Sequence, residues 1–508
     1  MMAEPAAVLM VQGTASHVGK STLVTALCRI FRQDGLRVAP FKAQNMALNS
    51  FVAIEGGEIG RAQAVQAEAA GVEPSVDMNP ILLKPEGEAR SQVVLEGRAS
   101  GSLGAADYHR AHERFWPVVE AALARLRSRF DLVVIEGAGS PAEVNLRSTD
   151  LANMRVALHA GAPVLLVGDI ERGGVFASLL GTLELLQPQE RSLVCGLAIN
   201  KFRGDLSILL PGLELLEQRT GVPVLGVLPF LPHLDLPEED SLGLDGSRGT
   251  TEGPGLDLAV ARLPRIANFD DFSPLAAEPS VRLRYVDDSL RLGRPDLLFM
   301  PGTKTTVADL AWLRQTGLAD ATVRLRETGT PVVGICGGLQ MLGQRILDPH
   351  GAESPVPETA GLGLLPVETS FATVKRTCRV RGRVATRRGP LGSACGGELA
   401  GYEIHMGQTT IGGQLERLFA IHERSGQTVD DSDGLFSPDG LVLGTYLHGL
   451  FENPPIRAAL LGWLSARTGR APAPVAAPID RERQYDALAD AVRHSLDIAR
   501  LKSACNLA

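Results

Sequence analysis

Two long series of apolar strand-like runs, each alternating with helical patterns, constrain the fold of this chain most. The first series spans residues 7–228, and the second begins near residue 256 and continues to about residue 468. Alternating strands and helices favour a parallel sheet covered by helices on both faces. The strands expected in the second series are 281–286, 297–300, 332–335 and 441–446. The sequence therefore predicts an α/β chain whose first half is a mainly parallel, doubly wound sheet.

The alternation lapses between residues 237 and 255, where PEEDSLGLDGSRGTTEGPG is acidic, Gly-rich and aperiodic. Such a composition is typical of a linker or surface loop. We therefore expect an N-terminal domain at 1–236 and a second domain at 256–468. The remaining residues, 469–508, begin with a Pro-rich linker, after which Leu488, Val492 and Leu496 recur at the spacing of a packing helix.

Residues 7–22, AVLMVQGTASHVGKST, place an apolar strand before a Gly-rich turn and a helix that Gly35 is positioned to end. Small residues let consecutive N–H groups wrap a phosphate, with the helix dipole behind it. A lysine then binds the terminal phosphates, and a hydroxyl binds magnesium. The alternative is an ordinary strand-to-helix turn. The residues expected to bind ATP here are Gly13, Gly19, Lys20, Ser21 and Thr22.

A carboxylate ends a later strand of the same half. The run DLVVIEG reads as a buried strand that stops at Glu136. At that edge of a parallel sheet a carboxylate can reach the Mg²⁺ of a bound nucleotide. We therefore expect Ser21 and Glu136 to hold the metal, the alternative being a surface glutamate.

A cysteine stands at a sharp turn in the second half. In PVVGICGGLQMLG an apolar run delivers Cys336 to a glycine-flanked turn, and the residues at 339, 341, 342 and 346 suit a helix packed on that strand. Such an elbow exposes a thiol near the positive end of a helix. His448, in LVLGTYLHGLFEN, can take the thiol proton and return it to a leaving amine. These residues predict acyl transfer from an amide; the alternatives are a buried apolar cysteine and a core histidine.

The string GICGGLQMLG followed by YLHG resembles the class I glutamine amidotransferases, which implies a flavodoxin-like domain. By this resemblance Cys336 attacks the side-chain amide of glutamine, His448 is the base and Gln340 helps to seat the glutamine. In PDLLFMPGTKTT the N–H groups near Gly302 can form an oxyanion hole with that of Gly337, although Gly302 also suits a plain turn.

One position departs from that family. Many members carry a glutamate two residues after the histidine, and here that position is Leu450. Glu452 and Glu403 lie in nearby segments, but a solvated or structural role is the favoured interpretation for each. The residue that orients His448 is therefore unassigned.

The phosphate loop has the spacing G-x5-G-K-S from Gly13 and resembles the dethiobiotin synthetase type. Lys42 matches a lysine that lies near phosphate and substrate carboxylate in that group, unless it is simply solvated. Asn200 resembles the asparagine that reads the base in related nucleotide-binding domains. The strings KAQNMALNS, NLRSTDLANMRVA and GDIERGGVFAS resemble the cobyric acid synthase family over nearly the whole chain.

That resemblance implies ATP- and glutamine-dependent amidation of adenosylcobyrinic acid a,c-diamide, a corrinoid acid, at its b, d, e and g carboxylates. ATP would activate each carboxylate as an acyl phosphate for attack by ammonia. The residues expected at this ligase site are Lys42, Gln44, Asn45, Asp150 and Asn153, with Gln44 and Asn45 on the loop after a strand. For Asp150 the alternative is a helix-start aspartate.

Two other functions are the alternatives to this interpretation: a,c-diamide synthesis and an ATP-dependent switch. The sister a,c-diamide synthases usually carry a GPDYID-like segment near Lys42, which this sequence does not have. The first half also resembles the MinD/ParA nucleotide switches, but those loops carry a signature lysine soon after the first glycine. Between Gly13 and Lys20 this loop has none.

The composition of the chain limits the classes of binding partner that we expect. A net charge of −8 argues against an electrostatic nucleic-acid partner. The sequence has no run of 18 apolar residues and no secretory pattern, so we expect a cytoplasmic protein without a membrane partner. The six cysteines show no CxxC spacing and so predict neither a disulfide framework nor a zinc site. Whether the chain forms a homo-oligomer stays open.

Overall fold

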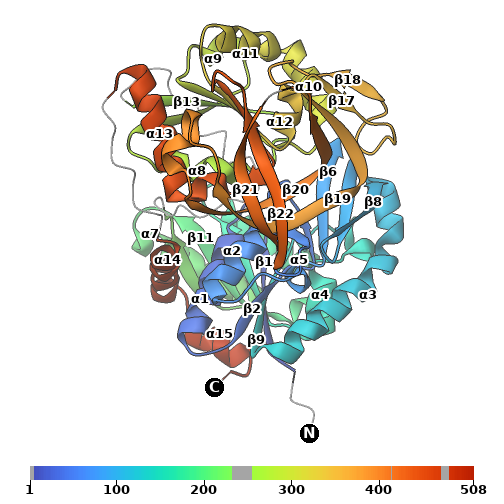
Figure 1. The fold of residues 1–508 in the computed structure, drawn as a ribbon. Helices are drawn as coiled ribbons and strands as arrows, with labels where there is room; N and C mark the ends of the chain where they lie inside the picture. Colours follow the sequence, from blue (N-terminus) through green and yellow to red (C-terminus); the bar gives the residue numbers. More distant parts are fainter. Residues whose placement is uncertain (1–4, 88, 232–254, 414, 471–479, 508) are drawn as a thin grey trace.

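A computed structural model describes residues 5–87, 89–231, 255–413, 415–470 and 480–507 (Figure 1). Two α/β halves are stacked on one another, the first drawn in blue to green and the second in yellow to orange. Of the linker predicted at 237–255, all residues except Gly255 lie outside the described residues. The predicted α/β class is confirmed, since each half is built around a sheet with a parallel core.

The sheet of the first half has six strands, and every pair of neighbours is parallel. In spatial order the strands are β12 (Val224–Pro229), β11 (Val194–Phe202), β10 (Val164–Asp169), β1 (Ala7–Gly13), β9 (Leu132–Glu136) and β2 (Val38–Phe41). The carboxyl ends of β1, β2 and β9 lie together at one edge, where parallel sheets bind ligands.

Side chains that alternate along each strand fill two separate cores. In β1, Val8 and Met10 belong to one core and Leu9 and Val11 to the other. The helices that contribute to the first core are α3 (Ala105–Arg129), α4 (Met154–Ala160), α5 (Val175–Leu185) and α7 (Leu206–Thr220). The second core is covered by α1 (Lys20–Gln33), α14 (Arg481–Ser495) and α15 (Ile498–Ala504). The sheet is therefore doubly wound, as predicted, with the short α6 (Pro188–Arg191) between α5 and β11.

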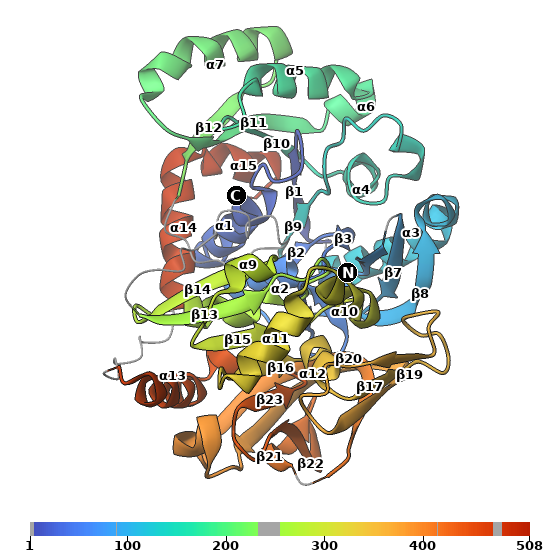
Figure 2. The same cartoon turned by 90° about the horizontal axis from the view of Figure 1, so that it is seen from above.

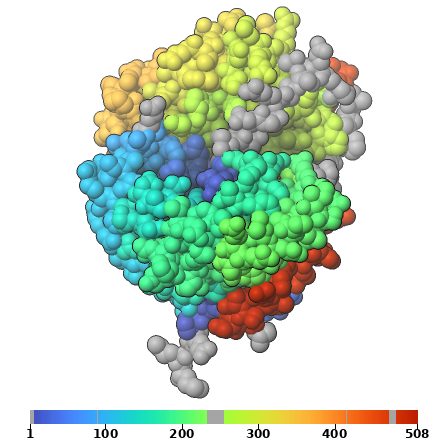
Figure 3. Space-filling model, turned by 180° about the vertical axis from the view of Figure 1, so that it is seen from behind, coloured from blue at the N-terminus to red at the C-terminus, as the bar shows by residue number. Residues whose placement is uncertain are grey.

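The C-terminal helices return to the first half. Leu488 and Val492 of α14, with Leu496 just beyond it, pack in the same core as α1, which confirms the predicted packing helix. Arg29 of α1 pairs with Asp486 at 2.7 Å. Figures 2 and 3 show these red helices against the N-terminal half rather than the half that precedes them in sequence.

Residues between β2 and α3 form structure that the sequence did not predict. A four-stranded sheet contains β3 (Gln44–Met46), β6 (Ile81–Gly87), β7 (Arg90–Leu95) and β8 (Arg98–Gly104). A hairpin pairs β4 (Ser50–Val52) with β5 (Glu58–Gly60), and α2 (Arg61–Ala70) and the turn η1 (Val76–Met78) follow. The prediction that Gln44 and Asn45 lie on a loop is wrong, because their backbone pairs with β6.

The second half contains a twelve-stranded sheet. Its parallel part is β14 (Val281–Val286), β13 (Leu256–Ala261), β15 (Leu297–Met300), β16 (Val332–Ile335) and β23 (Val442–Thr445). The other strands are β22 (Gln427–Phe436), β21 (Glu416–Arg424), β19 (Val367–Val384), β20 (Glu398–Ile411), β17 (Arg345–Leu347), β18 (Glu358–Ala360) and β24 (Leu447–His448). Of these, β19 to β22 are long antiparallel strands, which the predicted strand and helix alternation did not include.

The helices of this half are α8 (Ser273–Ala276), α9 (Ser289–Leu292), α10 (Thr306–Gln315), α11 (Leu318–Glu327), α12 (Gly337–Leu342) and α13 (Pro454–Thr468). The 3₁₀ turns within the described residues are η1 together with η2 (Arg147–Thr149), η4 (Phe269–Phe272), η5 (Gly389–Ala394) and η6 (Leu450–Glu452). Ile346 lies in β17 and not in the predicted helix, because Gly343 ends α12 in extended backbone. Among the described residues, every helix is too short or too polar to cross a bilayer.

Candidate active sites

Cys336 stands at a strained turn between β16 and α12. Its φ of 51° lies in the left-handed region, which is costly for a residue with a side chain. The turn needs glycine around it: a Cβ on Gly338 would lie 1.9 Å from the Met300 carbonyl oxygen. A Cβ on Gly334 would lie 2.7 Å from the backbone of Gly338. The strand and helix can therefore approach closely only with these glycines, and the thiol projects from the apex.

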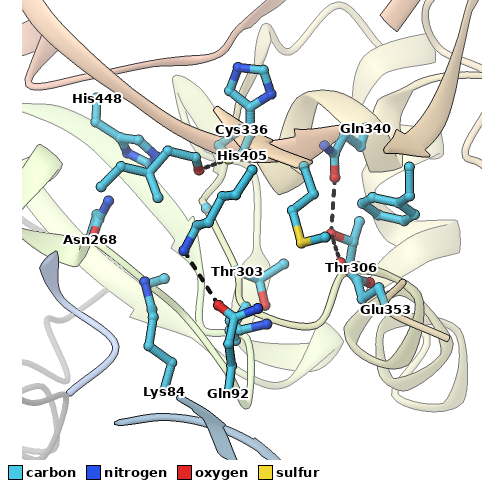
Figure 4. A pocket seen from close by; sticks show the side chains of 17 residues that line it. Lys84, Gln92, Asn268, Thr303, Thr306, Cys336, Gln340, Glu353, His405 and His448 are labelled. Carbon is cyan, nitrogen blue, oxygen red and sulfur yellow. Dashed lines mark hydrogen bonds between the residues drawn. The ribbon is translucent and has the colours of Figure 1, made fainter. Parts of the chain in front are cut away.

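The predicted exposure of this thiol is wrong. Cys336 is 7% exposed and faces a cavity that both halves enclose. Figure 4 shows Cys336, His448 and Gln340 on one side, and on the other Lys84 of β6 and Gln92 of β7, two neighbouring strands of the N-terminal half. The sequence suggested an open elbow because it does not show that the first half closes over the second.

Asp271 holds His448 on the cavity that Cys336 also lines. Nδ1 of His448 lies 2.7 Å from Oδ2 of Asp271. The other oxygen of Asp271 accepts from the N–H of Gly449 at 2.7 Å. Both side chains are buried, at 2% exposure. This cysteine, histidine and aspartate thus form a chain suited to moving a proton from the thiol.

The charges around His448 favour its protonated form. Burial opposes the imidazolium, but the Asp271 carboxylate and the neighbouring Cys336 outweigh that penalty and raise the pKa of His448 to about 10. A histidine in this setting readily accepts and holds a proton from the thiol at neutral pH.

Asp271 is the orienting residue that the sequence left unassigned. It lies 177 residues before His448, in the turn η4, and the string NFDDF carries no spacing that links it to the histidine. The two glutamates considered from the sequence bond elsewhere: Glu403 pairs with Arg424 at 3.1 Å, and Glu452 pairs with Arg481. Both glutamates thus form ion pairs away from His448, in agreement with the solvated or structural role expected from the sequence.

Gln340 lies on the same cavity and is bonded on both sides. Its Oε1 accepts from Thr306 at 3.0 Å, and its Nε2 lies 3.3 Å from the hydroxyl of Tyr446. Thr306 also contacts the partly buried Glu353, where desolvation raises the pKa of the carboxyl to about 7 despite the N–H of Val307. These polar groups converge beside the thiol, where a small polar substrate would be held (Figure 4).

The two glycines predicted for an oxyanion hole flank the thiol. A Cβ on Gly302 would lie 3.0 Å from Cε1 of His448 and 3.8 Å from Cβ of Cys336. Gly337 follows the cysteine and opens α12, and a Cβ there would lie 3.2 Å from the N of Thr303. The backbone of the 302–303 loop and the start of α12 therefore lie close together beside Cys336.

The Gly-rich loop after β1 wraps the end of α1. Lys20 donates from Nζ to the carbonyl oxygens of Ala15 and Gly139, each at 2.9 Å. Gly19 has φ 95° and opens the helix, and a Cβ on Gly13 would lie 3.0 Å from Nζ of Lys20. Thr22 is exposed in the first turn of the helix. The loop thus gathers a lysine and a helix N-terminus, an arrangement suited to phosphate.

Glu136 ends β9 next to this loop. Its Oε1 accepts from the hydroxyl of Ser21 at 2.8 Å and from Nζ of Lys42 at 2.9 Å, and its Oε2 accepts from Gln66 at 2.6 Å. Burial disfavours the carboxylate, but Lys42, Gln66 and Ser21 outweigh it and lower the pKa of Glu136. A hydroxyl and an ionised carboxylate at this separation are the hard oxygen donors that Mg²⁺ prefers.

Two other residues predicted for the ligase site, Asp150 and Asn153, lie between β9 and α4. Asn153 donates to the carbonyl of Ala138 at 2.7 Å and so holds the loop that follows Glu136. Asp150 accepts from the N–H groups of Ala152, Asn153 and Arg155 ahead of α4, which is the helix-start role weighed as its alternative.

Gln44 and Asn45 bond within the N-terminal half. Gln44 accepts from the hydroxyl of Tyr108 at 2.6 Å, and Asn45 donates to Gln63 of α2 at 2.9 Å.

Asn200 holds the phosphate loop by a hydrogen bond from β11. Its amide donates to the carbonyl of Val18 at 2.8 Å, and a Cβ on Gly19 would lie 2.1 Å from its Nδ2. The neighbouring Lys201 donates to the carbonyl of His17 and pairs with Asp169 at 2.9 Å. The loop is therefore held from the strand β11 as well as from α1.

Several polar residues that sequence patterns did not indicate join the two halves. Glu58 pairs with Lys84 of its own half and with Lys375 of β19. Arg61 of α2 pairs with Asp270, next to the orienting Asp271. These are contacts between residues more than 200 positions apart or between separate elements, so no local spacing reveals them.

Family models match both halves. Residues 9–242 match the CobQ/CobB/MinD/ParA nucleotide binding domain, and residues 257–456 match the CobB/CobQ-like glutamine amidotransferase domain. The chain is 50% identical to cobyric acid synthase of Dehalococcoides mccartyi (strain CBDB1) over 99% of each chain. It is 54% identical to cobyric acid synthase of Sorangium cellulosum (strain So ce56) over 97% of each chain. A third relative, cobyric acid synthase of Pelotomaculum thermopropionicum, is 54% identical over 97% of this chain and 95% of its own.

Proposed function

Because this chain belongs to the cobyric acid synthase family, we propose that it amidates the b, d, e and g carboxylates of adenosylcobyrinic acid a,c-diamide with ATP and glutamine. The observation that carries the proposal is the pairing of two sites in one chain. One is the buried thiol, imidazole and carboxylate of the second half, and the other is the phosphate loop beside Glu136 in the first. Ammonia release and carboxylate activation are the two halves of an amidation.

Residues of the second half release ammonia from glutamine. His448 holds the proton taken from Cys336 while the thiolate attacks the carboxamide carbon, and Asp271 stabilises the imidazolium. The N–H groups at Gly302 and Gly337 receive the oxyanion. Collapse of the tetrahedral species expels ammonia, which carries the proton returned by His448, and leaves a γ-glutamyl thioester. Water then hydrolyses the thioester to glutamate and regenerates the thiol, while Gln340 and Glu353 hold the substrate.

Residues of the first half bind ATP and the carboxylate to be activated. Gly13, Gly19, Lys20 and Thr22 surround the phosphates, and the two carbonyl partners of Lys20 are ones that phosphate oxygens can replace. Ser21 and Glu136 would hold Mg²⁺, which neutralises charge on the phosphates when bound. Asn200 would face the base side of this loop.

Lys42 places a buried cation between Glu136 and the incoming carboxylate. Transfer of the γ-phosphoryl group from ATP to a substrate carboxylate gives an acyl phosphate and ADP. Attack by ammonia then forms the amide and releases phosphate. We also assign Gln44, Asn45, Asp150 and Asn153 to the ligase site, where Asn153 would act through its bond to Ala138 in the loop after Glu136.

The proposal also concerns the organisation of the chain. We assign 1–236 to an ATP-binding synthetase domain and 256–468 to the amidotransferase domain. The helices α14 and α15 then close the synthetase domain, because they share its core. The reaction uses ATP, and we expect it in the cytoplasm.

Mass spectrometry tests the function directly. Purified protein is incubated with ATP, Mg²⁺, glutamine and either cobyrinic acid or its a,c-diamide, and each amidation lowers the corrinoid mass by a unit. Four successive decreases from the a,c-diamide are expected. Two decreases from cobyrinic acid, with no further step, would instead identify an a,c-diamide synthase, and ATP turnover without any amidation would refute the proposal.

A further inference from the structure

The loop that carries Asp271 is shaped by the N-terminal half. Ser50 donates from its N–H to Oδ1 of Asn268 at 3.0 Å, and the N–H of Phe269 donates to Oδ1 of Asn49 at 3.2 Å. Both bonds are buried. Asn268 has φ 52°, so the chain enters this turn in the left-handed region. Such a conformation persists where surrounding contacts hold it.

A buried ion pair adds to these contacts. Nε of Arg61 lies 3.0 Å from Oδ2 of Asp270, and the two side chains are 5% and 8% exposed. The guanidinium also lies 5.1 Å from the centroid of the Phe51 ring. Burial raises the pKa of Asp270, the charge of Arg61 lowers it, and the adjacent Asp271 raises it again. Arg61 is thus the cation paired with Asp270, and the adjacent Asp271 pairs with His448.

Asp270 and Asp271 are consecutive, so their positions are linked through one peptide. Asp271 makes two 2.7 Å bonds, to Nδ1 of His448 and to the N–H of Gly449. Loss of the Arg61 charge would leave Asp270 buried without its arginine partner, which is unfavourable unless the carboxyl group moves or becomes protonated. Either response displaces Asp271 or changes the charge that it presents to His448.

We propose that Arg61 of the synthetase half is a positioning residue for the ammonia-releasing site, acting through Asp270 and Asp271 on His448. The proposal rests on the function proposed above. Arg61 does not line the cavity at Cys336, so it acts on the base and not on glutamine itself. The base of one domain is therefore held by a cation of the other.

The helix α2, which carries Arg61, also contacts the proposed magnesium site. Arg61 is the first residue of the helix, and Gln66, five residues on, donates to Glu136 at 2.6 Å. All but one of the residues of this ten-residue helix are buried, so it packs as a rigid element. Figure 1 shows α2 at the junction of the two halves. One short helix thus contacts both the carboxylate proposed for magnesium and the ion pair behind the glutaminase base.

Arginine variants at the domain junction separate this role from simple packing. Arg61→Gln removes the positive charge. Arg61→Lys keeps the charge but replaces the planar guanidinium by a single ammonium group. Arg379→Gln is the matched control, because Arg379 also crosses the junction, lies 5.5 Å from the same Phe51 ring and bonds to the carbonyl of Val52 and to Glu73, away from Asp270. The full-length protein is used throughout, with thermal melting as a check on folding.

The first measurement is steady-state glutamine hydrolysis. We expect Arg61→Gln to lower kcat by about tenfold or more while the KM for glutamine stays within about twofold, with Arg61→Lys intermediate and Arg379→Gln within about twofold of wild type. The second is the rate of iodoacetamide alkylation of Cys336 against pH, followed by peptide mass spectrometry. Because alkylation reads thiolate formation without turnover, Arg61→Gln should change this pH profile and Arg379→Gln should not.

Equal losses in Arg61→Gln and Arg379→Gln, or a kcat for Arg61→Gln within about twofold of wild type, overturn the positioning role. An unfolded Arg61→Gln leaves Asp270→Asn to decide, because this variant removes the carboxylate through which Arg61 acts. A wild-type kcat and alkylation profile in Asp270→Asn also overturn the positioning role. Ammonium-dependent amidation by the wild-type enzyme is measured alongside. Its failure refutes the proposed function, whereas the Arg61 comparison uses only glutamine hydrolysis and the alkylation of Cys336.

Discussion

Replacing Asp271 by asparagine tests the assignment of the residue that orients His448. The substitution keeps the size of the side chain and removes its charge. The pKa of His448 is about 10 against an ordinary value of 6.5, and at about 1.4 kcal/mol per pH unit this corresponds to roughly 5 kcal/mol in favour of the imidazolium. Asp271 and Cys336 share that preference, so we assign about 3 kcal/mol to Asp271, or a loss of about a hundredfold in kcat.

The assay is ammonia release from glutamine at saturating substrate, and Glu452→Gln is the control. Glu452 follows His448 closely in sequence but pairs with Arg481, so its loss should leave kcat within about twofold of wild type. Asp271→Asn should keep its ammonium-dependent amidation, since Asp271 contacts the amidotransferase base. A folded Asp271→Asn enzyme with kcat within about threefold of wild type would refute the orienting role.

Stability against pH gives an independent check on the same pair. The folded-state pKa of His448 is raised above its unfolded value, so the stabilisation is fully present below about pH 6.5 and is lost as pH rises toward about 10. In urea unfolding, the difference in free energy of unfolding between wild type and Asp271→Asn should therefore be largest at pH 6 and shrink by pH 9.5. A difference that grows with pH would contradict the charge pairing.

Three further substitutions test the other assigned groups. Cys336→Ser should lose glutamine-dependent amidation while ammonium salts still support the reaction; normal use of glutamine would show that another residue is the nucleophile. Lys20→Ala should lower amidation from glutamine and from ammonium alike, by roughly 3 kcal/mol or about a hundredfold, with glutamine hydrolysis partly retained; undiminished amidation in a folded variant would remove this loop from the ATP site. Glu136→Gln should raise the Mg²⁺ concentration for half-maximal amidation by about tenfold or more, and an unchanged Mg²⁺ titration would exclude it as a ligand.

Local sequence patterns were sufficient to predict a site wherever that site is built from one strand, one turn and one helix. The loop around Lys20 follows this rule, because its strand, its glycines and its helix are contiguous in the chain. The elbow at Cys336 does so as well, since Gly334 and Gly338 allow its strained turn by close backbone approach. Glu136 could be predicted at the end of a buried strand because parallel strands bring their carboxyl ends to one edge.

The long antiparallel strands β19 to β22 and the small sheets between β2 and α3 were harder to predict. Their residues alternate between buried and exposed positions, and many polar side chains stand at the domain junction rather than in water. Gln44 and Asn45 are examples: they look like loop residues, yet their backbone pairs with β6. Tertiary pairing outweighed local propensity in these segments.

By itself, the sequence determined the α/β class, the phosphate loop, the nucleophile elbow and the likeness to the cobyric acid synthase family, because each depends on residues close together in the chain. Only the tertiary structure decided that Asp271 orients His448, that Arg61 of the other half braces Asp271 through Asp270, and that both halves bury Cys336. Those contacts join residues up to 209 positions apart, from Arg61 to Asp270, and depend on how two separately formed sheets pack together. Hydrophobic periodicity specifies each sheet, whereas the few buried charges between them are placed by that packing.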